Sequence, residues 1–155
     1  MPTPDFVLAL REKIGHDRLW LGGVTAVVIR DDSVLLVRRV DTGQWSLVTG
    51  IIEPGEEPAI TARRETLEEA GVDVEVTRLV GVDSTDDVTF PNGDVASFLS
   101  LTFRCRWISG EPTPLDDENT DAAWFPIDAL PPLSERYRRR LALAVENRPE
   151  AHFRA

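Results

Sequence analysis

The chain has 155 residues, of which 42% are hydrophobic, and these are spread along its whole length. This size predicts one compact domain over residues 1–155, with enough apolar material for a core. No run approaches the roughly 18 consecutive apolar residues that a membrane span needs. The 27 acidic and 17 basic side chains give a formal net charge of −10, which disfavours binding to the phosphate backbone of long nucleic acids.

The N-terminus and the single cysteine bear on the cellular compartment. The first residues lack a basic start, a long apolar centre and a small-residue cleavage site, so they do not resemble a secretory signal. Cys105 has no second cysteine for an internal disulfide, and it lies among strand-like residues. We therefore expect a buried thiol in a cytoplasmic protein.

The first half of the chain predicts a helix, a hairpin, a loop and a second helix. Apolar residues recur at helical spacing over about 5–14. Two β-rich runs, 24–29 and 34–40, flank a polar tetrapeptide, which is typical of a hairpin. Glycine and proline punctuate residues 43–55 and indicate a shaped loop. Residues 57–70 should then form a helix, with Pro in its first turn and Gly just past its end.

The second half predicts strands followed by a terminal helix. Residues 72–82 and 95–107 have strand character, and the Asn-Gly pair within 90–94 indicates a hairpin turn. A short strand at 124–125 precedes an amphipathic helix over about 133–147. This order predicts an α/β fold in which a mixed sheet is sandwiched between helices (α/β/α).

The helix over 57–70 carries three glutamates on one face. Glu65, Glu68 and Glu69 stand at i, i+3 and i+4, where like charges repel by a few tenths of a kcal/mol per pair. A divalent cation would relieve that repulsion, and hard oxygen ligands suit Mg²⁺ or Mn²⁺. A solvated glutamate-rich face is the alternative. Whether the glutamates bind a cation or are solvated, the opposite face of this helix should be buried. That face contains Ala59, Ile60, Ala62, Thr66, Leu67 and Ala70.

Residues 50–72 resemble the Nudix box. That pattern is Gly, five residues, Glu, seven residues, Arg-Glu, an aliphatic, any residue, Glu-Glu, any residue, Gly and an aliphatic. The matching residues are Gly50, Glu56, Arg64, Glu65, Glu68, Glu69, Gly71 and Val72. Thr66 departs from the aliphatic preference, and Val48–Thr49 stand where many members have Pro-Gly. The resemblance covers roughly residues 20–130 and implies the Nudix fold.

The resemblance also implies a metal site. Glu65, Glu68 and Glu69 would ligate Mg²⁺, with Mn²⁺ as an alternative, and Thr49 would add its backbone oxygen. Arg64 would pair with a carboxylate, either orienting Glu65 or bonding to Glu56.

The remaining box residues would be structural. Glu56 would tie the loop to the helix, Gly50 would permit a tight turn, and Gly71 would end the helix.

The implied reaction is metal-dependent hydrolysis of a diphosphate linkage in a nucleoside diphosphate-X: a nucleotide sugar, an ADP-ribose-like molecule or a nucleoside triphosphate. The proton acceptor is left open between Glu65 and an acidic residue of the loop before Trp124. Of the acidic residues 116–118, Glu118 reaches furthest and is preferred, and a solvated acidic loop is the alternative.

Substrate selection should depend on residues outside the box. Trp20, Trp45 and Phe90 are candidates for stacking on a base, although each also suits a core or rim position. Arg38 and Arg39 end the second β-rich run just before the loop, and either is a candidate for binding substrate phosphate. Strand alternation allows only one of them to face the cleft directly, and Arg38 is preferred.

Two other functions stay open. One is removal of pyrophosphate from RNA 5′ ends, which the acidic surface disfavours, and the other is nucleotide sensing without turnover. A homodimer is possible. The arginines of the terminal helix should form a solvated face while Tyr137, Leu141 and Ala144 pack inward, and binding to an acidic partner or another subunit is the alternative. Those arginines are Arg136, Arg138, Arg139 and Arg140.

Overall fold

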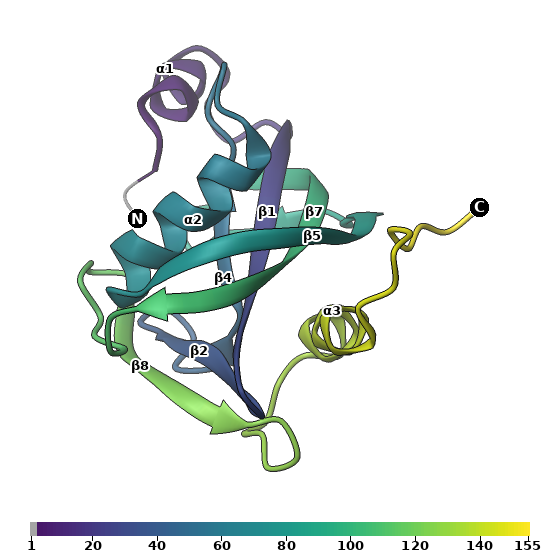
Figure 1. Cartoon of the computed structure of the whole chain (residues 1–155). Coiled ribbons are helices and arrows are strands. Elements are labelled where there is room, and N and C mark those ends of the chain that lie inside the picture. Colours follow the sequence, from purple (N-terminus) through teal and green to yellow (C-terminus); the bar gives the residue numbers. More distant parts are fainter. Residues whose placement is uncertain (1–2) are drawn as a thin grey trace.

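The computed structural model describes residues 3–155, in which an eight-stranded sheet is flanked by helices (Figure 1). The helices are α1 (Asp5–Ile14), α2 (Pro58–Ala70) and α3 (Glu135–Glu146). The strands are β1 (Leu19–Arg30), β2 (Ser33–Arg39), β3 (Trp45–Ser46), β4 (Val48–Ile51), β5 (Asp73–Ser84), β6 (Val88–Thr89), β7 (Val95–Ser109) and β8 (Asn119–Pro126). None of the helices within residues 3–155 has the length and apolar character that crossing a membrane requires.

The sheet is mixed, as the order of predicted elements indicated. Its main order is β3-β2-β1-β7-β5, with β4 on β1, β6 on β7 and β8 on β2. β1 and β7 run parallel, whereas the other pairs are antiparallel. β4 lies inside the segment 43–55, for which the sequence predicts a loop. The prediction missed this strand because it has only four residues and has glycine and proline close by.

The sheet divides into two branches beside the candidate site. Along one edge, residues 23–26 of β1 pair with β4, and further along the same edge residues 29–30 pair with β2. β2 in turn carries β8. The β1 edge therefore branches into β4 and the β2–β8 pair, and α2 contacts the β4 branch closely.

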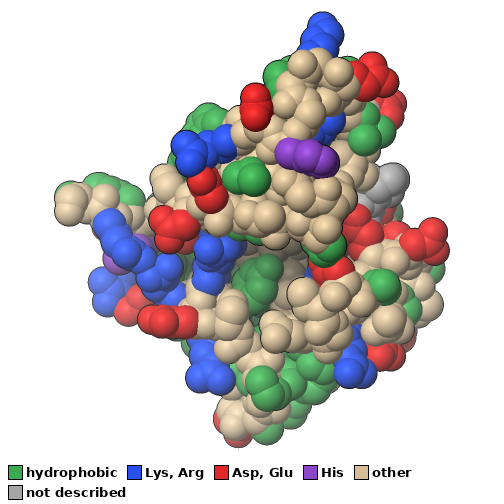
Figure 2. Space-filling model, turned by 180° about the vertical axis from the view of Figure 1, so that it is seen from behind, with side chains coloured by type: hydrophobic (Ala, Val, Ile, Leu, Met, Phe, Trp, Pro, Cys, Tyr) green, Lys and Arg blue, Asp and Glu red, His purple; other side chains and the backbone are tan. Residues whose placement is uncertain are grey.

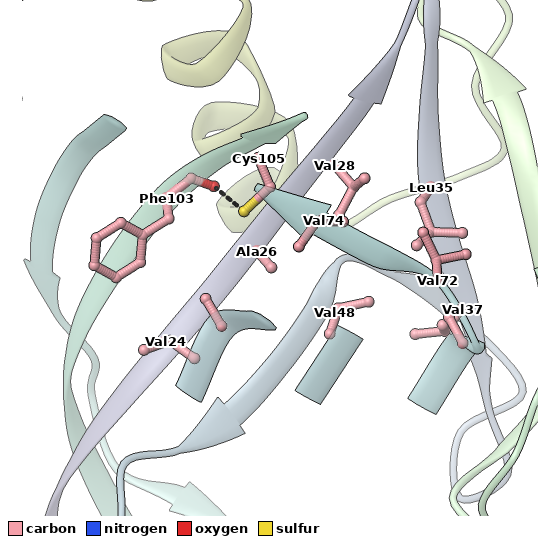
Figure 3. Close-up of a cluster of buried hydrophobic side chains, with 12 residues drawn as sticks. Val24, Ala26, Val28, Leu35, Val37, Val48, Val72, Val74, Phe103 and Cys105 are labelled. Carbon is pink, nitrogen blue, oxygen red and sulfur yellow. Dashed lines mark hydrogen bonds between the residues drawn. The ribbon is translucent and has the colours of Figure 1, made fainter. Parts of the chain in front are cut away.

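The two faces of the sheet bury separate cores. Alternate residues of β1, Val24, Ala26 and Val28, pack with residues of α2 (Figure 3). The intervening Val27 and Ile29 pack with α3 on the opposite face. Helices thus cover both faces, as the α/β/α prediction required.

Cys105 belongs to the α2-side core. Its side chain is buried among valines, and its thiol points to the carbonyl oxygen of Phe103 at 3.9 Å (Figure 3). Burial raises the pKa of the thiol to about 12. The expectation of a buried thiol is confirmed.

α3 begins and packs largely as predicted. The Ser134 hydroxyl accepts a hydrogen bond from the Tyr137 amide at 3.3 Å, which caps the helix. Leu141 and Ala144 are buried, and Tyr137 packs beside them. Arginine side chains gather over the side of the molecule formed by α3 and the C-terminal segment (Figure 2).

Arg140 corrects one expectation for α3. It is buried rather than solvated, and its guanidinium donates to Thr25 Oγ1 and Asp83 Oδ1, each at 2.8 Å. A helix of 3.6 residues per turn places Arg140 beside Leu141 and Ala144 on the packed face, and the polar partners on β1 and β5 compensate for its burial.

Candidate metal and catalytic site

α2 begins and ends where its sequence predicts. Pro58 occupies the first turn, and Gly71 ends the helix with a φ of 65°, its amide donating to the Leu67 carbonyl at 3.0 Å. A left-handed φ at this position favours glycine because it has no Cβ. The predicted helix over 57–70 is confirmed within one residue.

The buried face of α2 differs from the expected one. Ile60 and Leu67 are 60% and 47% exposed, whereas Glu65 and Glu69 are buried. The other buried residues of the helix are Thr61, Ala62, Thr66 and Ala70. The expectation that Ile60 and Leu67 lie on the buried face was therefore wrong, and Glu65 and Glu69 share the packed side with small residues instead. Burying carboxylates in place of available apolar side chains is costly unless a partner compensates.

Arg64 connects the carboxylates at the N-terminal side of this face. Its Nε and Nη2 donate to the two oxygens of Glu56 at 2.7 and 2.9 Å, a bidentate pair. Its Nη1 donates to Glu65 at 3.0 Å and to Glu68 at 3.1 Å. The hydrogen bonds from Arg64 and from the Thr61 hydroxyl lower the pKa of Glu56 to about 2. Arg64 therefore makes both of the contacts that the sequence left as alternatives.

Glu65 is pressed against β4 where that strand has no side chain. A Cβ built on Gly50 would overlap the Cγ and Cδ of Glu65. The Glu65 carboxylate has one oxygen bonded to Arg64, and its Oε2 is buried without a partner among residues 3–155. Burial raises the pKa of Glu65 to about 8, despite the nearby Arg64. Gly50 lies within β4 and its φ is not positive, so it is a site of close approach and not the turn residue that the sequence predicted.

Glu69, one turn further along α2, faces the β2–β8 branch. Its carboxylate lies with those of Asp116 and Glu118 so that one oxygen from each falls within 4.8 Å of the others. Burial, with contributions from these two carboxylates, raises the pKa of Glu69 to about 8. Three carboxylates converging on one small volume form an oxygen-rich group of the type that binds a hard divalent cation.

The loop before β8 holds Asp116 and Glu118 in place. Asp116 accepts from the Glu118 amide at 3.1 Å, and the Glu118 carbonyl accepts from the Val40 amide at 2.8 Å. The Glu118 side chain pairs with Arg39 at 3.2 Å, and Arg39 also pairs with Asp41 at 3.3 Å. Backbone and side-chain contacts therefore join this loop to the end of β2.

The comparison with known families decides the identity of the fold. A model of the NUDIX domain matches residues 20–144. The chain belongs to the NUDIX domain family. The residues that resemble the Nudix box all lie within this match, from β4 through the following loop and α2 to the two residues after that helix.

This NUDIX chain is similar to curated proteins of bacteria. The NAD-capped RNA hydrolase NudC of Pseudomonas aeruginosa is 39% identical over 109 residues, which cover 69% of this chain and 36% of the relative. A MutT-like protein of Streptomyces ambofaciens is 34% identical over 125 residues, covering 79% of this chain and 75% of the relative. The chain thus spans little more than a third of the NudC sequence that it matches.

Solved NUDIX structures show the same fold. A MutT NUDIX hydrolase from Burkholderia pseudomallei is 28% identical, with a TM-score of 0.67 over 81% of this chain and 98% of that chain. An ADP-ribose pyrophosphatase from Streptococcus suis is also 28% identical, with a TM-score of 0.65 over 86% of this chain and 96% of that chain.

The structure places the two arginines predicted to bind substrate phosphate in different surroundings. Arg39 lies at the carboxylate group, whereas Arg38 donates to the Gly43 carbonyl at 2.9 Å and lies 3.9 Å from Asp121. The preference for Arg38 therefore finds no support in the arrangement of the NUDIX site. Alternation along β2 places Arg39 on the α2 side of the sheet and Arg38 on the α3 side, but the sequence alone did not indicate which of these two faces bears the site.

The predicted aromatic residues also differ in their surroundings. Trp45 packs edge-on against Phe125, with ring centroids 4.8 Å apart, as part of the α3-side core. Trp20 is 60% exposed on β1, and Phe90 is exposed beside the β6–β7 turn. Trp45 is thus a packing residue, while Trp20 keeps a free surface.

Two residues at the NUDIX site were not singled out from the sequence. Asp116 was passed over in favour of the longer Glu118, and Asn119 was not considered. Asn119 is buried, and its amide Nδ2 lies 3.3 Å from Glu69 Oε2. The acidic run 116–118 was the available signal for Asp116, but the sequence carried no comparable signal for Asn119.

Proposed function

We propose that this NUDIX chain is a divalent-metal-dependent pyrophosphohydrolase that cleaves the diphosphate linkage of a nucleoside diphosphate-X. The observation that carries the proposal is the convergence of Glu69, Asp116 and Glu118, one helical turn from buried Glu65. Family membership and relatives named as hydrolases and pyrophosphatases support the same reading.

The residues at the site fit Mg²⁺ or Mn²⁺. Glu65 and Glu69 are buried carboxylates with raised pKa values, and Glu65 Oε2 is buried without a partner in the described chain. A cation would offset the cost of burying these carboxylates and would give Glu65 Oε2 a partner. A donor set of carboxylate oxygens suits these hard ions. Glu65, Glu68 and Glu69 would hold the ion or ions, with the Thr49 carbonyl, Asp116 and Glu118 as further ligands.

A bound divalent ion would neutralise diphosphate charge and make an attacking water more acidic. The protein's own contribution is positioning. Arg64 fixes the directions of Glu65 and Glu68 through charged hydrogen bonds, and Glu56 fixes Arg64 in turn. Glu65 and Glu118 are the two candidates for accepting the proton of the attacking water.

Arg39 is our candidate for binding the substrate's phosphates. Its guanidinium already lies at the carboxylate group, 3.2 Å from Glu118, with its planar donors in reach of the site. When a cation satisfies Glu118, Arg39 can turn its donors to a phosphate oxygen. Trp20, with its exposed ring, is the candidate for stacking on a base.

Action on a 5′-capped RNA is a second candidate, favoured by two observations. Relatives are named NAD-capped RNA hydrolases, and basic side chains gather over α3 and the C-terminal segment although the chain is acidic overall (Figure 2). Such a local basic surface would offset repulsion between RNA phosphates and the net charge of −10. A nucleotide sensor without turnover is the alternative if no substrate is cleaved.

A product-resolved substrate screen tests the proposal. NAD, ADP-ribose, a UDP-sugar, a nucleoside triphosphate and a short NAD-capped RNA are each incubated with the full chain and Mg²⁺ or Mn²⁺. We expect mononucleotide products from at least one diphosphate, and no turnover in excess chelator. The Glu69→Gln variant serves as the inactive control. Metal-dependent binding without any cleavage would instead support the sensor.

Other features of the protein stay predictions. These are a single domain over residues 1–155, a homodimer and a cytoplasmic location. Size-exclusion chromatography with light scattering measures the oligomeric state directly.

A further inference from the structure

Asn119 stands out as a neutral residue among the carboxylates of the candidate site. It is the first residue of β8 and is 5% exposed. Its Nδ2 lies 3.3 Å from Glu69 Oε2 and 3.4 Å from Asp116 Oδ1. Its Oδ1 is buried and has no hydrogen-bond partner within residues 3–155. Burying this oxygen without a partner costs free energy, so the place of the amide in the site calls for an explanation.

A β-bulge turns Asn119 toward the site. Ala122 and Trp124 of β8 pack with the α2-side core, so regular alternation would place Thr120 on that face and Asn119 on the other. The pairing with β2 instead steps from Arg38↔Asp121 to Arg39↔Asn119 and leaves Thr120 unpaired and exposed. The inserted residue reverses the alternation, and Asn119 meets Glu69 of α2. Bulges beside functional sites commonly redirect a side chain in this way.

The chemistry of an amide suits this position. Glu69 and Asp116 repel one another, and a donor between them lowers the cost of holding both as carboxylates. A cationic donor would neutralise the negative field that attracts a metal ion, whereas an amide leaves their charges in place. The amide also fixes the direction of one Glu69 oxygen, which leaves the other oxygen and its lone pairs to a cation.

We propose that Asn119 is a positioning residue, whose amide holds Glu69 and Asp116 together in an arrangement ready to bind a divalent cation. The proposal rests on the metal site of the proposed function and adds a residue to it. Residues that orient metal ligands typically change metal affinity by about 10- to 100-fold when they are replaced.

Mn²⁺ binding to the full chain, measured by titration calorimetry and by electron paramagnetic resonance of free Mn²⁺, tests the proposal. We expect Asn119→Ala to raise the Kd for Mn²⁺ by about tenfold or more. Asn92→Ala is the matched control, because Asn92 also donates to an aspartate, Asp94, at 3.1 Å, but lies in the β6–β7 turn. The control variant should bind Mn²⁺ as the wild type does.

The possible results separate this proposal from the proposed function. If wild type binds Mn²⁺ and Asn119→Ala binds it equally well, the positioning role is overturned while the metal site stands. If wild type itself binds no Mn²⁺, the metal site and this proposal both fail. Should Asn119→Ala not fold, Asn119→Leu, which keeps the side-chain volume without the donors, is measured under the same criteria. A merely structural role would lower the melting temperature without moving the Kd.

Discussion

At the scale of single residues, the site keeps carboxylates where apolar side chains would be more stable. Glu69 is buried with a pKa raised to about 8, and its Oε2 accepts a hydrogen bond from Asn119 Nδ2 at 3.3 Å. We expect Glu69→Gln to raise the melting temperature of the metal-free protein at pH 8 by a few degrees, since each kcal/mol gained corresponds to about 2–4 °C at this chain length. The same substitution should lower metal-dependent turnover by more than about a hundredfold, because it removes a ligand.

Scanning calorimetry in chelator and a phosphate-release assay in Mg²⁺ measure the two effects. Glu75→Gln provides a control, since Glu75 is a carboxylate of β5 that pairs with Arg106 at the surface. It should change neither quantity appreciably. A Glu69→Gln variant that turned over substrate at the wild-type rate would remove Glu69 from the metal site.

At the scale of elements, the sequence predicts α2 better than it predicts the surroundings of α2. Pro58 and Gly71 mark its ends through local backbone preferences, so the helix follows from nearby residues alone. The carboxylate partners of Arg64 also lie close to it in the sequence, so a local pattern indicates these contacts. The orientation of Asn119 depends on a bulge where β8 pairs with β2. These strands are far apart in the sequence; the nearby contact between Arg39 and Glu118, for example, joins residues that are 79 positions apart. No local pattern encodes that register, so the residue could not be found from the sequence.

The contact between α2 and β4 makes a testable demand on one glycine. An added methyl group at Gly50 would overlap buried atoms of Glu65, which has no room to withdraw. We expect Gly50→Ala to lower the free energy of unfolding by about 1–3 kcal/mol, as overpacking does, and to weaken Mn²⁺ binding as well. Denaturant unfolding and Mn²⁺ titration measure these effects.

Gly22→Ala on the neighbouring strand is the control for Gly50→Ala. Its added Cβ would meet only the Ile52 side chain, whose movable Cδ1 end is nearest at 3.3 Å and whose other atoms are at ordinary contact distance. We expect a smaller loss of stability and no change in Mn²⁺ affinity. Equal effects of the two substitutions on Mn²⁺ affinity would mean that the close approach of Glu65 to Gly50 is unimportant for the site.

At the scale of the whole molecule, the buried carboxylates couple stability to pH and metal. Glu65 and Glu69 have pKa values of about 8 in the folded protein, against 4.5 for an ordinary glutamate. Below pH 4.5 both carboxyl groups are protonated in the folded and in the unfolded protein. Between about pH 4.5 and 8 they are ionised in the unfolded chain but still protonated in the folded protein. Their contribution to stability is therefore complete in acid and is lost as the pH rises toward 8. Glu56, with its pKa lowered to about 2, acts in the opposite direction, but only between about pH 4.5 and 2.

We therefore expect the melting temperature in chelator to fall between pH 5.5 and pH 8. Excess Mg²⁺ should raise it more at pH 8 than at pH 5.5, because the ion binds ionised carboxylates and competes with protons for them. Thermal unfolding at a series of pH values, with and without Mg²⁺, measures both trends. A Glu65→Gln, Glu69→Gln double variant should flatten the fall and abolish most of the Mg²⁺ effect. If Mg²⁺ stabilised the double variant as much as the wild type at pH 8, the ion would be binding elsewhere, and the coupling between this site and the stability of the fold would be refuted.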